Sequence, residues 1–138
     1  MRIPPPVRGG ALLLALSGCA GGLFSTEAPR SFPPLEAGKG RVYVYRTSSY
    51  TGAAYTPDVL LNGVRVGKPG RRGVVYRDVA PGSYAVTTTL TSSVVNFAVA
   101  AGEKKYVRIN AGLLKSQLLP ELVDQAEGEA EVSRLPPM

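Results

Sequence analysis

Histidine and tryptophan are absent from this 138-residue sequence, and cysteine occurs once. Without an imidazole, Ser-His-Asp and Cys-His catalysis are excluded, because both need a group that exchanges a proton near neutral pH. A single cysteine excludes an intramolecular disulfide, and with no histidine the two commonest zinc ligands are missing together. We therefore expect a protein that is not an enzyme and that holds no metal or cofactor.

Long hydrophobic runs are also missing. The apolar run GGALLLAL over residues 9–16 is far too short for a membrane-spanning helix, which needs about 20 apolar residues. Two cations, Arg2 and Arg8, precede it, and no acid does. A basic start followed by a short apolar run is typical of a signal peptide, which we place at residues 1–18.

The end of this segment, Leu16, Ser17, Gly18 and Cys19, resembles the lipobox of bacterial lipoproteins. The resemblance implies that the signal peptidase recognises the first three residues and that Cys19 carries the lipid attachment, a thioether to diacylglycerol. Several acyl chains hold a protein at a membrane, because each buried methylene contributes about 0.8 kcal/mol. Alanine at position 20, in place of aspartate, favours the outer membrane, with the protein facing the periplasm.

The mature chain divides into a tether and one domain. Residues 19–40 contain tandem glycines and three prolines, which predict a flexible tether. From residue 41, short β-branched and aromatic runs alternate with turn residues at intervals of about ten positions. This pattern predicts an all-β domain over residues 41–138, a small antiparallel β-sandwich of about seven or eight strands with a short C-terminal helix.

The first strand, residues 41–46, places Val42 and Val44 on one face and two half-buried tyrosines, Tyr43 and Tyr45, on the other. The Asn-Gly pair at 62–63 predicts a tight hairpin, and the Ala-Pro-Gly-Ser sequence at 80–83 predicts a second reversal.

Later elements follow the same pattern. Strands are expected at 84–91, 94–100 and 105–110. The apolar segment 113–123 is expected to be an edge strand, because Pro120 interrupts it. Asp124 could begin a short helix that extends to Arg134, although Gly128 weakens the helix.

In their order behind the lipobox, several of these pieces resemble the uncharacterised bacterial lipoprotein family known as domain of unknown function 2846. The pieces are the Val-Tyr-Val-Tyr-Arg strand at 42–46, Leu61-Asn62-Gly63 with Gly67, the turn at 79–82 and the sequence Tyr-Val-Arg at 106–108. The resemblance implies a small all-β domain on the periplasmic side of an envelope, with no assigned activity.

Charge is unevenly distributed along the mature chain. Residues 19–120 hold thirteen Lys and Arg against five acids, whereas residues 121–138 hold one Arg against five acids, so the two parts are expected to attract each other. Lys68, Arg71 and Arg72 form a basic loop that could bind an anionic envelope partner, although charges that merely keep a strand edge from aggregating would give the same pattern. Nucleic acid is not an expected partner, because no RNP-like strand pair is present.

The seven tyrosines suggest a surface for glycans, and Tyr50 and Tyr55, in a loop rich in Ser, Thr and Gly, are the candidates.

Two functions therefore remain. The first is a lipid-anchored module that binds an envelope protein or polymer, held to the membrane by its acyl chains. The alternative is a periplasmic carrier of a small ligand or glycan, which predicts a pocket of several hundred Å³. An enzyme would need a converging polar cluster, such as Lys104 or Lys105 beside a serine.

Overall fold

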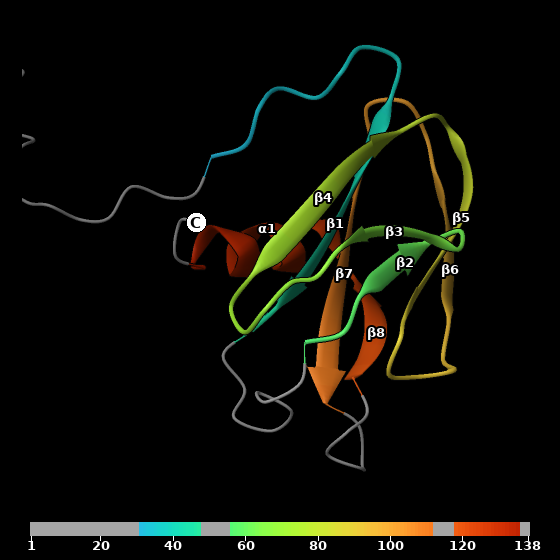
Figure 1. Cartoon of the computed structure of the whole chain (residues 1–138). Coiled ribbons are helices and arrows are strands. Elements are labelled where there is room, and N and C mark those ends of the chain that lie inside the picture. The colour runs from blue at the N-terminus through green and yellow to red at the C-terminus, as the bar shows by residue number, and fades with distance from the viewer. Residues whose placement is uncertain (1–30, 48–55, 112–117, 136–138) are drawn as a thin grey trace, which may run out of the picture.

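The computed structural model describes residues 31–47, 56–111 and 118–135. These residues form eight strands and one helix (Figure 1). The elements are β1 (Gly40–Arg46), β2 (Val59–Leu61), β3 (Val64–Gly67), β4 (Val74–Val79), β5 (Gly82–Thr88), β6 (Val95–Val99), β7 (Lys104–Ala111), β8 (Leu118–Val123) and α1 (Gln125–Ser133).

The strands form two four-stranded sheets that pack as a sandwich. Sheet A has the order β4-β1-β7-β8, and sheet B has the order β3-β2-β5-β6. Neighbouring strands are antiparallel in both sheets, except that β1 and β7 run parallel. The all-β sandwich with a C-terminal helix is thus confirmed, and the parallel pair is a feature that the repeated turns of the sequence did not predict.

After β4, the chain passes to sheet B and back again before it forms β7, which runs parallel to β1. The predicted reversal at 80–83 is present, but it leads from β4 in sheet A to β5 in sheet B. The turn at Ala101–Gly102 leads back from β6 to β7 in sheet A. The chain therefore returns to the far side of β1 running in the same direction, as a crossover connection requires.

The turn at Asn62–Gly63 joins β2 to β3, as predicted. Both residues have positive φ angles, 50° and 80°, which a tight hairpin turn of this kind needs. Strand β5 begins at Gly82 and ends at Thr88, so the prediction of a strand over 84–91 is shifted, because residues 89–90 turn away. Strand β8 is an edge strand and contains Pro120, as expected, but the structure describes it only from Leu118.

The main core fills the space between the two sheets. It consists mainly of valines, among them Val42, Val44, Val86 and Val107, each at most 2% exposed. A cavity next to Val42 and Val44 has a volume of about 10 Å³, which is too small for a ligand. Thr88 adds a polar link, because its hydroxyl donates a 3.0 Å hydrogen bond from sheet B to the Leu118 carbonyl in sheet A.

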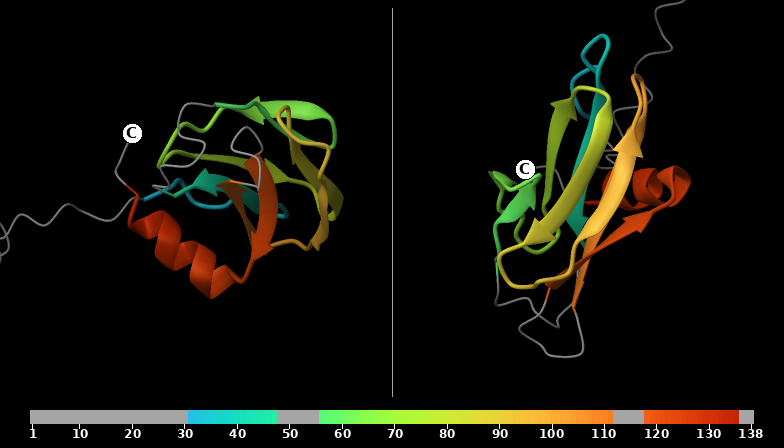
Figure 2. Two further views of the ribbon diagram at one scale, coloured as in Figure 1. Left: turned by 90° about the horizontal axis from the view of Figure 1, so that it is seen from below. Right: turned by 90° about the vertical axis from the view of Figure 1, so that its right-hand side faces the viewer.

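A third layer covers the outer face of sheet A. Helix α1 lies across this face, on the side away from sheet B (Figure 2). Beneath it Tyr43 and Tyr45 are 3% and 0% exposed, and Val132 and Leu135 pack against the same cluster. The predicted alternation of β1 is correct, but its tyrosine face is fully buried rather than half-buried, because the helix covers it.

Candidate functional site

Arg41, at the start of β1, is buried, and all five of its N–H groups have an acceptor. Its Nε donates to Asp78 Oδ1 over 2.5 Å, and Nη2 donates to Asp78 Oδ2 over 3.1 Å. The remaining donors reach the carbonyls of Pro33 and Pro34, at 2.7 and 3.2 Å, and the Tyr43 hydroxyl at 3.3 Å. We call this arrangement the Arg41 clamp, because it fixes residues 33–34 to the sheet.

The charges within the clamp stabilise each other. The hydrogen bonds from Arg41 hold the pKa of the Asp78 carboxyl below its ordinary value of 3.8, and the same bonds raise the pKa of Arg41. Asp78 also accepts a 3.2 Å hydrogen bond from the backbone N–H of Glu36. The Asp78 side chain is only 17% exposed.

Aromatic contacts continue the clamp toward the N-terminus. The ring of Phe32 meets those of Tyr43 and Tyr76 edge to face, with centroids 5.0 and 5.3 Å apart. Tyr43 stacks in turn on Tyr106 of β7, with centroids 4.6 Å apart and planes 3° from parallel. Residues 32–35 are thus packed on the domain, although they fall within the segment predicted to be a tether.

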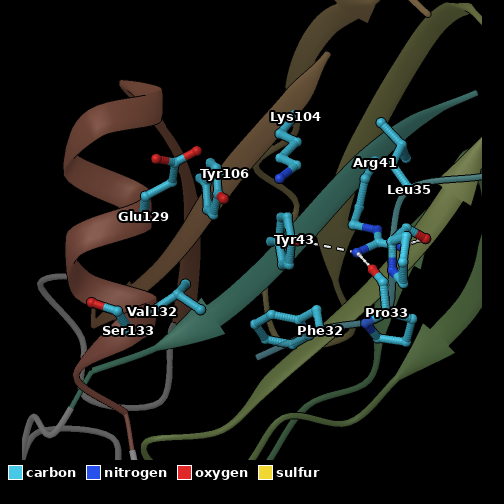
Figure 3. Close-up of a pocket in the computed structure, with 11 residues that line it drawn as sticks. Phe32, Pro33, Leu35, Arg41, Tyr43, Lys104, Tyr106, Glu129, Val132 and Ser133 are labelled. Carbon is cyan, nitrogen blue, oxygen red and sulfur yellow. Dashed lines mark hydrogen bonds between the residues drawn. The ribbon is translucent and has the colours of Figure 1, made fainter. Parts of the chain in front are cut away.

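Between residues 32–35 and helix α1 lies a cleft of about 370 Å³, which we call the N-terminal cleft (Figure 3). Tyr43 and Tyr106 form its floor, Phe32 and the prolines one wall, and α1 the other. Its charged lining residues include Lys104 from β7 and Glu129 from α1.

Helix α1 is attached to sheet A by a network around Arg108, which realises the predicted attraction between the basic body and the acidic tail. The Nη1 group donates to Glu127 and Glu131 at 2.9 and 2.7 Å, and Nη2 donates to Glu121 at 3.2 Å. The Tyr45 hydroxyl also donates to Glu131, at 2.6 Å. Burial, together with this hydrogen bond, raises the pKa of Tyr45, so the phenol stays protonated.

Tyr106 is held in its neutral form too. Burial raises its pKa, and the neighbouring Tyr43 adds to the effect. Both rings are 3% exposed, and each is stacked on the other, so neither offers an open face. The floor of the cleft therefore cannot serve as a stacking platform for a sugar ring.

The predicted basic loop lies where sheet A and sheet B meet at their β3–β4 edge. Lys68, Arg71 and Arg72 are exposed, and Arg65 and Arg77 on the flanking strands are exposed as well. We call these five cations the basic hairpin. Sequence positions 62–77 contain no acid, and Asp58, from the neighbouring loop, lies 2.9 Å from Arg65 Nε and 3.9 Å from Lys68 Nζ.

The loop of the basic hairpin has a fixed shape. Buried Arg46, at the end of β1, holds it from one side: the backbone N–H of Arg46 donates to Gly73 O at 3.0 Å, and its Nη1 donates to Pro69 O at 3.4 Å. Arg72 has a φ of 60°, the left-handed conformation that non-glycine residues rarely adopt. The turn therefore holds an arginine where glycine would be the less strained residue.

The remaining predicted site residues lie outside the described part of the chain. They are the lipobox residues Leu16, Ser17, Gly18 and Cys19, and the tyrosines Tyr50 and Tyr55. A lysine beside a serine would indicate an enzyme, and Lys104 and Ser133 do line the same cleft. However, Ser133 Oγ donates to Ala130 O of its own helix, and no hydrogen bond in the described chain joins Ser133 to Lys104. Lys105 pairs with Glu103 at 3.5 Å.

In the described ranges no cluster of three or more acidic or cysteine side chains is placed to hold a metal ion. The helix found there is also too short and too polar to cross a bilayer.

The N-terminal cleft is the part of the site that the sequence did not predict. Its walls come from residues about 90 positions apart, and no local pattern brings them together. The sequence did carry one signal for it: on each of the two strands, a cation and a tyrosine two positions apart point to the same face. The parallel register places these pairs side by side, Arg41 next to Lys104 and Tyr43 next to Tyr106. Without knowledge of that register, the four residues could not be assigned to one site.

These features place the protein in the class of all-β domains, with two sheets and a C-terminal helix that covers one outer face. The chain belongs to the family described as protein of unknown function DUF2846, whose model matches residues 36–117. This match confirms the resemblance noted from the sequence. It spans β1 to β7 and stops before β8 and α1, so the helical wall of the cleft lies outside it. No curated protein matches the chain.

Proposed function

We propose that the protein is a lipid-anchored lipoprotein of the cell envelope, attached through Cys19, which binds an anionic envelope protein or polymer. The anchor is supported by the lipobox-like residues 16–19 behind a basic and apolar leader. From Cys19 to the clamped residue Phe32, the chain could reach roughly 45 Å if fully extended. The domain would therefore act close to the membrane that holds it, on the periplasmic side of the outer membrane.

The basic hairpin is the observation that carries the binding proposal. Five exposed cations gather on one edge, and Asp58 lies close to two of them, Arg65 and Lys68. Concentrated positive charge attracts an anionic partner over several ångströms and speeds its encounter. Arg72 supports this interpretation, because strained backbone that persists in a native fold tends to lie at functional positions.

The anchor is tested by labelling cells with radioactive palmitate. The wild-type protein should incorporate the label, and Cys19→Ala should not. Equal labelling of the two proteins would contradict the lipid attachment.

The binding surface is tested by affinity capture from crosslinked envelopes. A variant with Lys68, Arg71 and Arg72 changed to Ala should recover a specific partner at least tenfold less well than the wild type. The control changes Lys39, Lys105 and Arg134 to Ala, which removes the same charge elsewhere and should leave recovery unchanged. An equal loss in both variants would indicate non-specific attraction, and no specific partner with the wild type would rule out the binding function.

The alternative function, a periplasmic carrier of a small ligand or glycan, is supported by a different observation. The N-terminal cleft has a volume of about 370 Å³, within the range of small-molecule sites. The cavity of about 10 Å³ between the two sheets is too small for a carrier to enclose a ligand in it. Binding of any small ligand that protects the cleft residues from solvent would favour this function.

A further inference from the structure

We propose that the N-terminal cleft binds a small zwitterion with an apolar body, either a free amino acid or a short peptide with free ends. The inference rests on the second function above, that of a small-ligand carrier, and specifies its ligand. It depends on one cation, one anion and an apolar wall, all of which line the same cleft.

The cation is Lys104, the first residue of β7. The residue is half-buried, and its side chain makes no hydrogen bond or ion pair with another residue of the described chain. The other cations on this face of sheet A, Arg41 and Arg108, are bound to Asp78 and to glutamates of β8 and α1. An ammonium without a counter-ion has its charged hydrogen-bonding capacity unused, so a carboxylate that enters the cleft gains a charged hydrogen bond there.

The anion is Glu129, on the helical wall. Figure 3 shows Lys104 and Glu129 on opposite sides of the Tyr106 ring. Glu129 Oε1 accepts a 2.9 Å hydrogen bond from Gln125, and its exposed carboxylate retains further acceptor sites. Ser133 lies on the same wall, and its hydroxyl donates a hydrogen bond to Ala130 O, so its oxygen remains available as an acceptor.

This arrangement selects a ligand that carries both charges. A carboxylate near Lys104 and an ammonium near Glu129 would each meet the opposite charge. A ligand with negative charge alone, such as a phosphate or a dicarboxylate, would be repelled by Glu129. Phe32 on one wall and Val132 on the helical wall give the cleft apolar surface that suits the apolar body of such a ligand.

The test is calorimetric titration of the full-length protein at pH 7 with L-leucine, leucine amide, N-acetyl-leucine and the dipeptide Leu-Leu. Leucine amide lacks the carboxylate, and N-acetyl-leucine lacks the ammonium. We expect leucine or Leu-Leu to bind at least tenfold more tightly than either blocked compound. Binding of leucine alone would identify a free amino acid as the ligand, and binding of Leu-Leu alone would identify a peptide.

Two substitutions separate recognition from folding. Lys104→Met should abolish the preference for leucine over leucine amide, and Glu129→Gln should abolish the preference over N-acetyl-leucine. Lys105→Met is the matched control, because Lys105 lies on the opposite face of β7 and pairs with Glu103. It should leave both preferences unchanged.

The inference is overturned if no zwitterion of the panel binds, or if Lys104→Met weakens leucine and leucine amide equally. Titration with N,N′-diacetylchitobiose, a neutral sugar, separates failure of the zwitterion proposal from failure of the carrier function. If this sugar binds and neither leucine nor Leu-Leu does, the carrier function stands and the zwitterion is wrong. If none of the three binds, both are contradicted.

Discussion

Gly128 of helix α1 lies directly against Tyr106 of β7, so closely that a Cβ atom at position 128 would be 2.3 Å from the tyrosine Cβ. The sequence suggested that this glycine weakens the helix, and its intrinsic helix propensity is indeed poor. In the structure the same residue allows the helix to approach sheet A. The loss of propensity is therefore offset by burial of the tyrosine face of β1 and β7.

Gly128→Ala should destabilise the protein by about 1–3 kcal/mol, because the added methyl group must displace the helix or the strand backbone. Urea unfolding measures the change. Gly70→Ala is the matched control, since nothing lies within 4 Å of a Cβ at that position, and its effect should stay below about 0.5 kcal/mol. Equal effects of the two variants would contradict the close approach of the helix.

The Arg41 clamp predicts a loss of stability in acid. Because the pKa of Asp78 is lowered in the folded state, the pair stabilises the fold at pH values above the ordinary 3.8 and loses this contribution as the pH falls through the lowered pKa. Asp78→Asn lacks the titrating group. The difference in unfolding free energy between wild type and variant should therefore be largest near pH 7 and shrink steadily below about pH 4. A difference that does not change with pH would contradict the ion pair.

Arg41→Lys keeps the charge but offers three donors where five are used, so residues 33–36 should separate from the sheet more often. Amide hydrogen exchange reports this directly, because the Glu36 N–H is bonded to Asp78. Its exchange should become at least tenfold faster, whereas the Arg46 N–H, at the other end of β1, should be unchanged. Unchanged exchange at Glu36 would show that the clamp does not hold this segment.

The two helical glutamates bound to Arg108 should differ in importance. Glu131 is 23% exposed and bonds to both Tyr45 and Arg108, whereas Glu127 is 51% exposed and bonds to Arg108 alone. Glu131→Gln should cost about 1–2 kcal/mol and Glu127→Gln less than about 0.5 kcal/mol, because exposed pairs contribute little. Thermal unfolding at low and high salt checks the order, and the effect of Glu127→Gln should vanish at high salt. The reverse order would contradict this account of the helix attachment.

Local patterns predicted the elements of the fold but not the contacts that build the cleft. The alternation of Val42 to Tyr45, the Asn62–Gly63 turn and the edge position of Pro120 each depend on neighbouring residues, and each was predicted from them. Helix α1 was expected after Asp124, although the Asp124 side chain makes no capping hydrogen bond and Glu127 binds Arg108 instead.

What the sequence could not supply is the register between distant strands. Arg41 lies beside Lys104 because β1 and β7 pair in parallel, and this pairing depends on a chain that changes sheet four times between the two strands. The basic hairpin, in contrast, could be predicted in part, because Lys68, Arg71 and Arg72 lie close together along the chain. Arg65 and Arg77 belong to the basic hairpin because β3 and β4 run on either side of that loop.

The central position of β1 in sheet A affects how the nascent chain can fold. One edge of β1 pairs with β4, about 30 residues later, but its other edge stays open until β7 has been synthesised, more than 60 residues later. Such non-local pairing is slow, because a long loop must close before the contacts form. A chain that left the ribosome or crossed a membrane N-terminus first would therefore carry β1 with one edge open until almost the whole domain had emerged.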